Sequence, residues 1–242
     1  MKLSEIRRCG FDTETTGPNP LEDRIVTAAL VVMGGGREDQ VFNWLINPGV
    51  EIPEEATAVH GITTEQARAK GDEPGPALDD LAQKLAQAMR FGMPVVAFNA
   101  AFDWTILDRD LARHGLQSMR ERLAGMEPLG LLDPFVIDKA VDKYRRGKRK
   151  LGLVCEHYGV ELTDWHTADA DARAAVLVMD QIAERCPELA DMSPQELFAQ
   201  QQRWAAEQAA SLQAYFRSEK AGDRYDPEAV VDGSWPLRSA PA

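Results

Sequence analysis

The sequence has few cysteines and no long apolar run, and both shortages exclude classes of protein. Its three cysteines, Cys9, Cys155 and Cys186, are far apart and include no CxxC pair, which argues against a disulfide framework and a structural zinc site. No apolar stretch approaches the roughly 20 residues that cross a bilayer, and residues 1–9 lack the apolar segment of a secretory signal. We therefore expect a cytoplasmic protein without a membrane span.

Basic residues are also fewer than acidic ones. The 242-residue chain has 27 Lys and Arg against 39 Asp and Glu, a net charge of −12. An acidic protein does not coat nucleic acid nonspecifically, so any contact with a polyanion must be local. One stretch offers such a contact, because residues 143–150 (KYRRGKRK) contain six basic residues in eight positions. A solvated loop is the open alternative.

Strand and helix patterns follow one another along the chain in an order that predicts a fold class. Three segments, 6–12, 24–33 and 39–46, predict an antiparallel meander. Residues 94–98 and 129–133 are short apolar runs between helical patterns, which indicates a mixed five-stranded α/β sheet with helices on both faces. The main expected helices are 76–90, 100–114, 133–144, 151–158 and 167–185.

A second, smaller part follows. Ser193 and Glu196 form a capping box that opens a long amphipathic helix to about residue 220. Residues 221–242 are predicted to be extended or poorly ordered, with Trp235 as an anchor. We predict a domain at 1–186, complete without the appendage at 187–242, and expect the helix to pack on that domain. Its apolar stripe is predicted to be Leu197, Trp204, Leu212 and Phe216.

Two carboxylates stand at the end of the first expected strand. Side chains of a strand alternate, so Asp12 and Glu14 face the same side. Two carboxylates held together repel unless a cation lies between them, and oxygen ligands favour a hard ion such as Mg²⁺ or Mn²⁺. On this segment alone, solvated surface is the commoner alternative.

Two further segments add acids and a histidine. Asp103 falls in the first turn of the 100–114 helix, beside the carboxyl end of a strand, where open α/β sheets place their ligands. Complementing the helix dipole is its simpler alternative. His166 and Asp171 cannot share one helix face, because five steps of about 100° separate them by about 140°. If both point at one site, His166 lies in the preceding loop, where its neutral imidazole is suited to accept a proton.

Together the three segments form a specific pattern. Asp12-x-Glu14, Asn99-x-x-Phe102-Asp103 and His166-x4-Asp171, in this order of strands and helices, resemble the DEDDh exonucleases of the ribonuclease H-like superfamily. The likeness is greatest to the DnaQ-like proofreading subunit of the polymerase III epsilon type. It covers about residues 5–185 and includes the string 59–63 (VHGIT).

The resemblance implies a reaction and a set of residues. It implies a 3′→5′ exonuclease of the proofreading or repair type, which hydrolyses phosphodiester bonds at the 3′ end of DNA. Single-stranded DNA is the preferred substrate, and a DNA polymerase or sliding clamp is a possible partner. Asp12, Glu14, Asp103 and Asp171 would hold two divalent metal ions, Mg²⁺ or Mn²⁺, and His166 would deprotonate the attacking water. The implied substrate contacts are Thr13, Thr15, Thr16, Glu55, His60, Asn99, Phe102 and Lys148, with Arg149 beside Lys148.

Several alternatives stay open. An exoribonuclease is one, because the few side chains that read a 2′-hydroxyl cannot be recovered from this sequence. A non-catalytic nucleic-acid-binding module of the same fold is another, although such a module has no reason to keep acids that repel one another. Residues 195–198 (QELF) faintly resemble a clamp-binding peptide but lie within the capped helix. Trp104 either stacks on a base or packs in the core.

Overall fold

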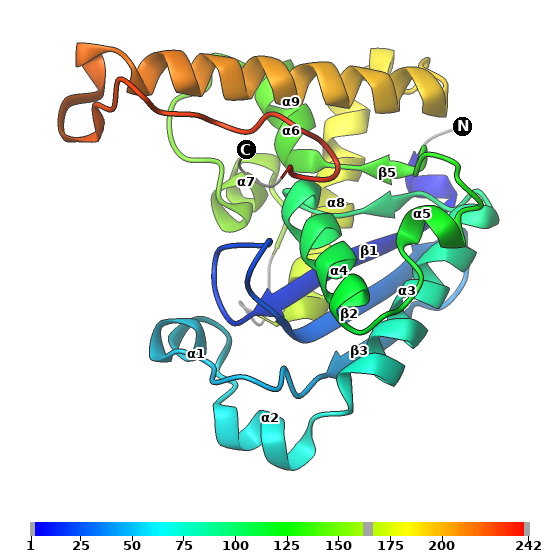
Figure 1. Ribbon diagram of the computed structural model, residues 1–242. Coiled ribbons are helices and arrows are strands. Elements are labelled where there is room, and N and C mark those ends of the chain that lie inside the picture. The colour runs from blue at the N-terminus through cyan, green and yellow to red at the C-terminus, as the bar shows by residue number, and fades with distance from the viewer. Residues whose placement is uncertain (1–2, 162–166, 240–242) are drawn as a thin grey trace.

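A computed structural model describes residues 3–161 and 167–239 of the chain, and its centre is one mixed sheet. The strand order is β3-β2-β1-β4-β5, and Figure 1 shows helices on both faces of this sheet. Neighbours β1, β2 and β3 pair antiparallel, whereas β4 and β5 run parallel to β1. The predicted fold class is therefore confirmed. The strands are β1 (Arg7–Thr15), β2 (Ile25–Gly34), β3 (Gln40–Leu45), β4 (Val95–Val96) and β5 (Leu131–Leu132).

Two apolar layers cover the two faces because side chains of the strands alternate. On one face α3 (Pro74–Arg90) and α4 (Ala100–Arg113) pack over Leu30 of β2. On the other face α7 (Leu151–Tyr158) and α8 (Ala168–Arg185) pack over the next residue, Val31. Leu30 and Val31 are both buried, so β2 carries apolar side chains in both directions.

Shorter elements join these layers. The described residues include no helix long and apolar enough to cross a membrane. The expected helix from residue 133 ends earlier than predicted, at Val141, because Asp142 already has a non-helical backbone (φ −121°, ψ 54°). The remaining elements are η1 (Leu3–Glu5), α1 (Glu54–His60), α2 (Thr64–Lys70), α5 (Met119–Arg122), α6 (Pro134–Val141), η2 (Pro187–Leu189), α9 (Pro194–Phe216) and η3 (Glu219–Arg224).

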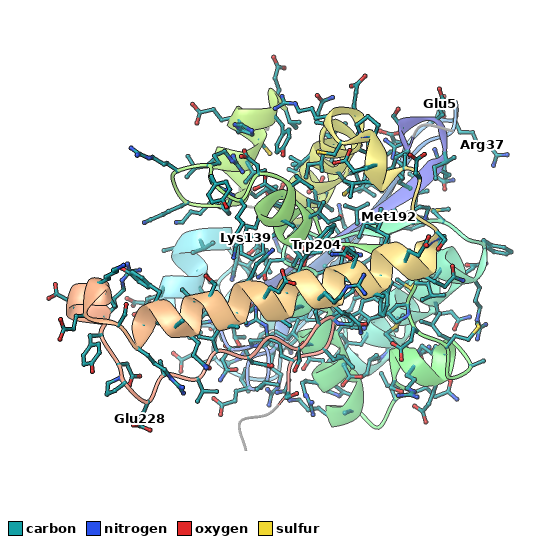
Figure 2. The ribbon with its side chains drawn as sticks, turned by 90° about the horizontal axis from the view of Figure 1, so that it is seen from above. Glu5, Arg37, Lys139, Met192, Trp204 and Glu228 are labelled. Carbon is teal, nitrogen blue, oxygen red and sulfur yellow. The ribbon has the colours of Figure 1, made fainter. Side chains whose placement is uncertain are left out.

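The long helix α9 packs on its own domain, as expected, and it covers the edge of the sheet. Figure 2 shows it crossing one side of the molecule. Gln201 is fully buried, and its side chain accepts from the Asp133 amide (2.8 Å) and donates to the Leu131 carbonyl (3.0 Å). These two bonds satisfy polar groups of the edge strand β5. The predicted stripe is wrong at Leu212, which is 41% exposed, because the C-terminal end of α9 extends past the sheet and its helices, as Figure 1 shows.

The segment after α9 is more ordered than the sequence predicts. Residues 219–224 form η3, and the chain then returns along α9 as an extended tail. Trp235 anchors this tail, since it is 5% exposed and its ring lies 5.2 Å from that of Phe198. The domain boundary at residue 186 stays a prediction, but these contacts argue that the two parts fold as one unit.

Candidate active site

Three carboxylates gather at the end of β1. Oxygens of Asp12, Glu14 and Asp171 all lie within 4.8 Å of one another, and each of the three side chains is half-buried. Asp12 and Glu14 project from the same face of β1, and Asp171 comes from the first turn of α8. Residues 159 positions apart in the sequence thus form a single group of oxygen ligands.

Gly10 explains how α8 comes close enough to β1. A Cβ atom at Gly10 would lie 2.3 Å from the backbone oxygen of Ala172, so no other residue permits this approach. Asp171 precedes Ala172, and Asp12 is two positions beyond Gly10 on the same strand face. The sequence analysis missed Gly10, although a glycine inside a strand often marks a close backbone approach.

Gly10→Ala is expected to move α8 away from β1 and separate Asp171 from Asp12. Overpacking of this kind costs typically about 1–3 kcal/mol of stability, and hydrolysis should fall more steeply than stability. Thermal unfolding and nuclease assays measure the two effects. A matched control is Gly75→Ala, because a Cβ at Gly75 meets nothing within 4 Å. Full activity in Gly10→Ala would contradict the role assigned to this glycine.

Asp103, the fourth expected acid, approaches from the opposite side of β1. It is 3% exposed on α4, and its Oδ1 accepts a 2.7 Å hydrogen bond from the Thr13 hydroxyl. Thr13 lies between Asp12 and Glu14, so its side chain points to the other face of the strand. The bond to Thr13 thus holds Asp103 at the same strand end, beside the group of three and outside it.

The electrostatics of the four acids are unfavourable without a cation. Burial, followed by repulsion from Asp103, Asp171 and Glu14, raises the pKa of Asp12 well above its ordinary range. Burial and the charges of Asp171 and Asp103 raise the pKa of Glu14 to about 8. Burial also raises the pKa of Asp103. A divalent ion among these oxygens would relieve the repulsion.

An open cavity adjoins the carboxylates. Its volume is about 860 Å³, which lies within the range of small-ligand sites, about 300–1,000 Å³. Thr13 and Thr16 are buried in its wall, and Glu55 is exposed at the start of α1. Seven of the eight expected substrate contacts line this one cavity, Lys148 being the exception: Thr13, Thr15, Thr16, Glu55, His60, Asn99 and Phe102.

His60 lies between this cavity and a smaller hollow of about 230 Å³. Its Nδ1 accepts a hydrogen bond from the Ile62 amide (3.2 Å), and the backbone of Thr15 also interacts with the ring. Partial burial lowers the pKa of His60, which favours a neutral ring. The smaller hollow is also lined by Glu14 and Thr167. His166, the expected general base, lies outside the described residues.

The comparisons with known proteins agree with this geometry. A family model described as an exonuclease, RNase_T, matches residues 9–179, which is more than half of the chain. The chain belongs to this exonuclease family. The match contains the three carboxylates and the residues that line the larger cavity, and it ends inside α8, before α9 and the tail.

Relatives of this exonuclease-family chain include polymerase proteins. A DNA polymerase III subunit epsilon-like protein of Rhodobacter capsulatus is 40% identical over 110 residues, 44% of this chain and 15% of that protein. The DNA polymerase III PolC-type protein of Lacticaseibacillus paracasei is 29% identical over 164 residues, 68% of this chain and 10% of that protein. The chain therefore spans only a small part of the curated relatives it matches.

Solved structures show the same fold. Exonuclease I of E. coli in complex with a dT13 oligonucleotide superposes with a TM-score of 0.63 at 19% identity, over 76% of this chain and 42% of that one. Exonuclease I from Methylocaldum szegediense superposes with a TM-score of 0.62 at 21% identity, over 76% and 41% of the two chains. The ribonuclease H-like architecture expected from the sequence is thus confirmed.

Asp133 joins four segments behind the site, and the sequence analysis treated it only as a helix start. Its buried carboxylate accepts from the amides of Asn99 (2.9 Å) and Ala100 (3.0 Å), where α4 begins, and from Phe135 in α6. It also accepts from the Trp235 indole at 3.1 Å. Burial raises the pKa of Asp133 to about 6. The residue therefore positions the helix that carries Asp103.

The basic run, residues 143–150, divides into two groups. Asp138 is fully buried and binds both Arg145 and the Arg149 Nε, the latter at 2.7 Å. The expectation that Arg149 meets phosphate is therefore wrong, because its charge is already neutralised inside the protein. Lys148 and Lys150 stay exposed. The two arginines attach this loop to α6 and leave the lysines toward solvent.

Two further candidates from the sequence, Trp104 and residues 195–198, pack inside the protein. Trp104 is 3% exposed in the core beneath α4, which decides between its two alternatives. Phe198, the last residue of the QELF string, is 4% exposed and packs against Trp235. This string therefore stabilises α9 and does not present its aromatic ring to a sliding clamp.

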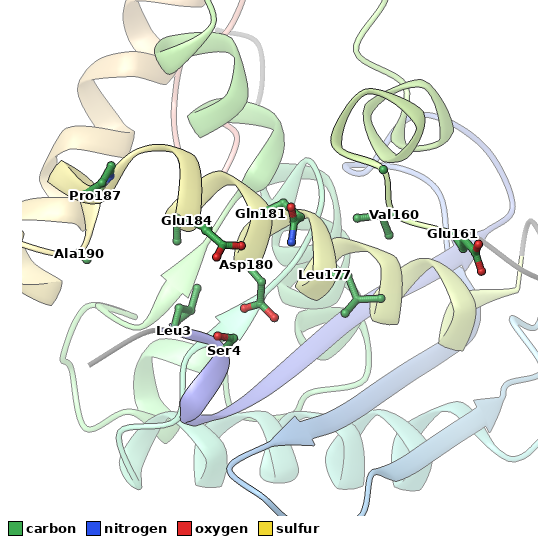
Figure 3. Close-up of a pocket in the computed structure, with 12 residues that line it drawn as sticks. Leu3, Ser4, Val160, Glu161, Leu177, Asp180, Gln181, Glu184, Pro187 and Ala190 are labelled. Carbon is green, nitrogen blue, oxygen red and sulfur yellow. The ribbon is translucent and has the colours of Figure 1, made fainter.

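Another cavity lies elsewhere, between η1, residues 159–161 and the C-terminal half of α8 (Figure 3). Its volume is about 840 Å³. Its wall includes Asp180, which binds Arg8 of β1. It contains none of the three clustered carboxylates, so volume alone does not identify the reactive site.

Proposed function

We propose that this chain is a metal-dependent 3′→5′ exonuclease that hydrolyses phosphodiester bonds at the 3′ end of DNA. The observation that carries the proposal is the group of three carboxylates, with oxygens within 4.8 Å of one another, beside a cavity of about 860 Å³. Membership of the exonuclease family supports a nuclease reaction at this place.

The site residues suit hard divalent ions. All the donors are carboxylate oxygens, which favour Mg²⁺ or Mn²⁺. Burial, followed by the charges of Asp171 and Asp103, raises the pKa of Glu14, and a cation would remove the part due to repulsion. We propose that Asp12, Glu14 and Asp171 hold these ions, with Asp103 as the fourth ligand. When bound, two such ions neutralise the scissile phosphate and stabilise the attacking and leaving oxygens.

Other residues bind the strand and move a proton. We propose that the terminal nucleotide lies against the backbone of residues 13–16, because Thr15 and Thr16 are buried in the cavity wall next to the carboxylates. We propose that His60 and Glu55 meet its free 3′-hydroxyl. The proposed general base is His166, whose ordinary pKa near 6.5 suits proton transfer from water at neutral pH.

The proposed substrate is single-stranded DNA. Complexes of E. coli exonuclease I hold dT13 and dA16 oligonucleotides, and the curated relatives include DNA polymerase III proteins. A DNA polymerase is the proposed partner, by analogy with those relatives.

The deciding experiment compares substrates that carry a label at one end. Single-stranded DNA labelled at its 5′ end should yield a ladder that shortens one nucleotide at a time, whereas a 3′ label should be released at once as a mononucleotide. The reverse pattern would contradict the polarity. Faster hydrolysis of RNA would favour the exoribonuclease alternative, and binding without hydrolysis in Mg²⁺ or Mn²⁺ would favour a non-catalytic module.

Metal-free protein is expected to lose stability as pH rises. Glu14 binds its proton more tightly when folded, with its pKa raised from 4.5 to about 8. This contribution to stability is full below the unfolded pKa and is lost as pH rises through the folded one. Melting temperatures in EDTA should thus fall between about pH 5 and 8, and Mg²⁺ should restore them most at the upper end. A flat profile in EDTA would contradict the electrostatic account.

Exposed lysines of the basic loop are expected to bind phosphates. Lys148→Ala with Lys150→Ala should weaken binding of single-stranded DNA and flatten its salt dependence by up to about 0.7 per lost contact. Fluorescence anisotropy over a salt series measures this slope. Arg37→Ala with Arg120→Ala removes the same charge at exposed positions on other elements and should leave the slope nearly unchanged. If the salt dependence of binding has the same slope in the two double variants, residues 143–150 are a solvated loop that does not contact the DNA.

A further inference from the structure

The tail after α9 returns to the entrance of the active site. Figure 1 shows it, in red, running back from the far end of α9 toward α4. The tail packs on α9, where Gly233 lies against the Ala206 backbone, and it contacts the domain, where the Trp235 indole donates to Asp133 at 3.1 Å. Asp133 in turn binds the amides that begin α4. The tail is therefore attached to the residue that positions this helix.

Hydrogen bonds on both sides of residue 238 fix the end of the tail. The Asp232 carboxylate accepts from the amides of Ser234 and Ser239, each at 2.8 Å, and closes this segment into a loop. The Arg238 amide donates to the hydroxyl of Thr105, a fully buried residue of α4, at 2.9 Å. The backbone of Arg238 is thus held by both the tail and the catalytic domain.

The Arg238 side chain lies at the rim of the larger cavity. Its Nη2 is 3.5 Å from Oδ1 of Asn99, and Asn99 and Phe102 line that cavity. Among residues 3–161 and 167–239, no carboxylate forms a salt bridge with it, although the Asp232 carboxylate of the same tail interacts with its charge, and the residue is half-buried. Arg113 and Arg149, by contrast, are paired with Asp110 and Asp138. Most N–H donors of the Arg238 guanidinium group therefore remain available to a ligand.

The surroundings of the cavity are acidic, so an arginine at its rim affects the binding of a polyanion. The cavity wall contains Glu14, Asp23 and Glu55, and the whole chain has a net charge of −12. A polyanion that approaches this entrance is repelled unless cations meet it locally. Arginine suits that contact, because its planar fork matches the oxygens of a phosphate.

We propose that Arg238 binds a backbone phosphate of the strand whose 3′-terminal nucleotide occupies the cavity. This inference rests on the proposed exonuclease function and extends it to a residue outside the family match at 9–179. The appendage thereby takes part in substrate binding, and the catalytic domain is not complete at residue 186 for this purpose. Arg238 is a binding residue, and its loss should leave the chemical step unchanged.

The test uses the full chain, with Arg238→Ala, Arg238→Lys and the charge-matched control Arg37→Ala. Binding of a fluorescein-labelled oligo(dT) is measured in EDTA over a salt series, and KM and kcat are measured in Mg²⁺. Arg238→Ala should raise Kd and KM about tenfold, lower the salt slope by about 0.7, and leave kcat unchanged. Arg238→Lys should keep the slope and recover part of the affinity, and Arg37→Ala should match wild type.

Two results would overturn the proposal. One is a wild-type slope and KM in Arg238→Ala. The other is an equal loss of affinity in Arg238→Lys and Arg238→Ala together with a lowered melting temperature. That result would mean that Arg238 stabilises the fold and does not bind the phosphate. The experiment separates this inference from the proposed exonuclease function. If the wild-type protein binds oligo(dT) through Arg238 but does not hydrolyse it, the inference stands and the proposed function fails. If the enzyme is active and its KM and salt slope do not depend on Arg238, the function stands and the inference fails.

Discussion

Asp12→Asn is expected to reduce hydrolysis of single-stranded DNA by at least about 10³-fold, because metal ions at such sites supply several kcal/mol of transition-state stabilisation and each 1.36 kcal/mol is a factor of ten. Asp12 belongs to the group of three carboxylates, and Asp103, Asp171 and Glu14 all raise its pKa. It is therefore the acid that interacts with every other member of the site. The neutral amide keeps the shape of the side chain but not its charge.

The same substitution should stabilise the metal-free protein. Burial, followed by the charges of Asp103, Asp171 and Glu14, opposes ionisation of Asp12. The neutral amide avoids this cost, so the melting temperature in EDTA should rise near pH 8 and the response to Mg²⁺ should shrink. Single-turnover hydrolysis and calorimetry measure the two effects. Asp169→Asn is the matched control, since Asp169 lies in the same turn of α8 but outside the group. Wild-type turnover in Asp12→Asn would contradict the proposal that Asp12 holds a catalytic metal ion.

His166→Ala is expected to lower kcat by about 10²–10⁴-fold with little change in substrate binding, the usual consequence of losing a general base. Thr167, the next residue, is the N-cap of α8 and lines the small hollow that also contains Glu14 and His60. The chain therefore enters α8 beside the proposed metal ligands, where a base is required to take a proton from the attacking water.

The pH dependence separates this role from a positioning role. In the wild-type enzyme a group with a pKa near 6.5 should limit kcat on the acid side, and that limb should disappear in His166→Ala. His114→Ala is the control, because His114 is exposed at the end of α4. Equal losses in kcat and in affinity for oligo(dT), with the acid limb retained, would assign the proton transfer to another group.

Local patterns in the sequence were sufficient for the main elements and for the order in which they follow one another, but not for α5 or η3. The helix expected at 151–158 coincides with α7 (Leu151–Tyr158), and the three antiparallel strands were located to within a few residues. Apolar spacing determines these features, because each side chain of a strand or helix faces a direction set by its own position. The same spacing places Asp12 and Glu14 on one side of β1.

Contacts between distant parts of the chain decided what the sequence left open. Gly10 admits α8 next to β1, Asp138 withdraws Arg149 from solvent, and Gln201 fills the open edge of β5. Each depends on a partner whose distance or pairing no local pattern encodes, so propensity and spacing could not reveal it. Arg238 is the clearest case: as a lone arginine near the chain end it carries no motif, and only the folding of the tail onto Asp133 and Thr105 brings it to Asn99.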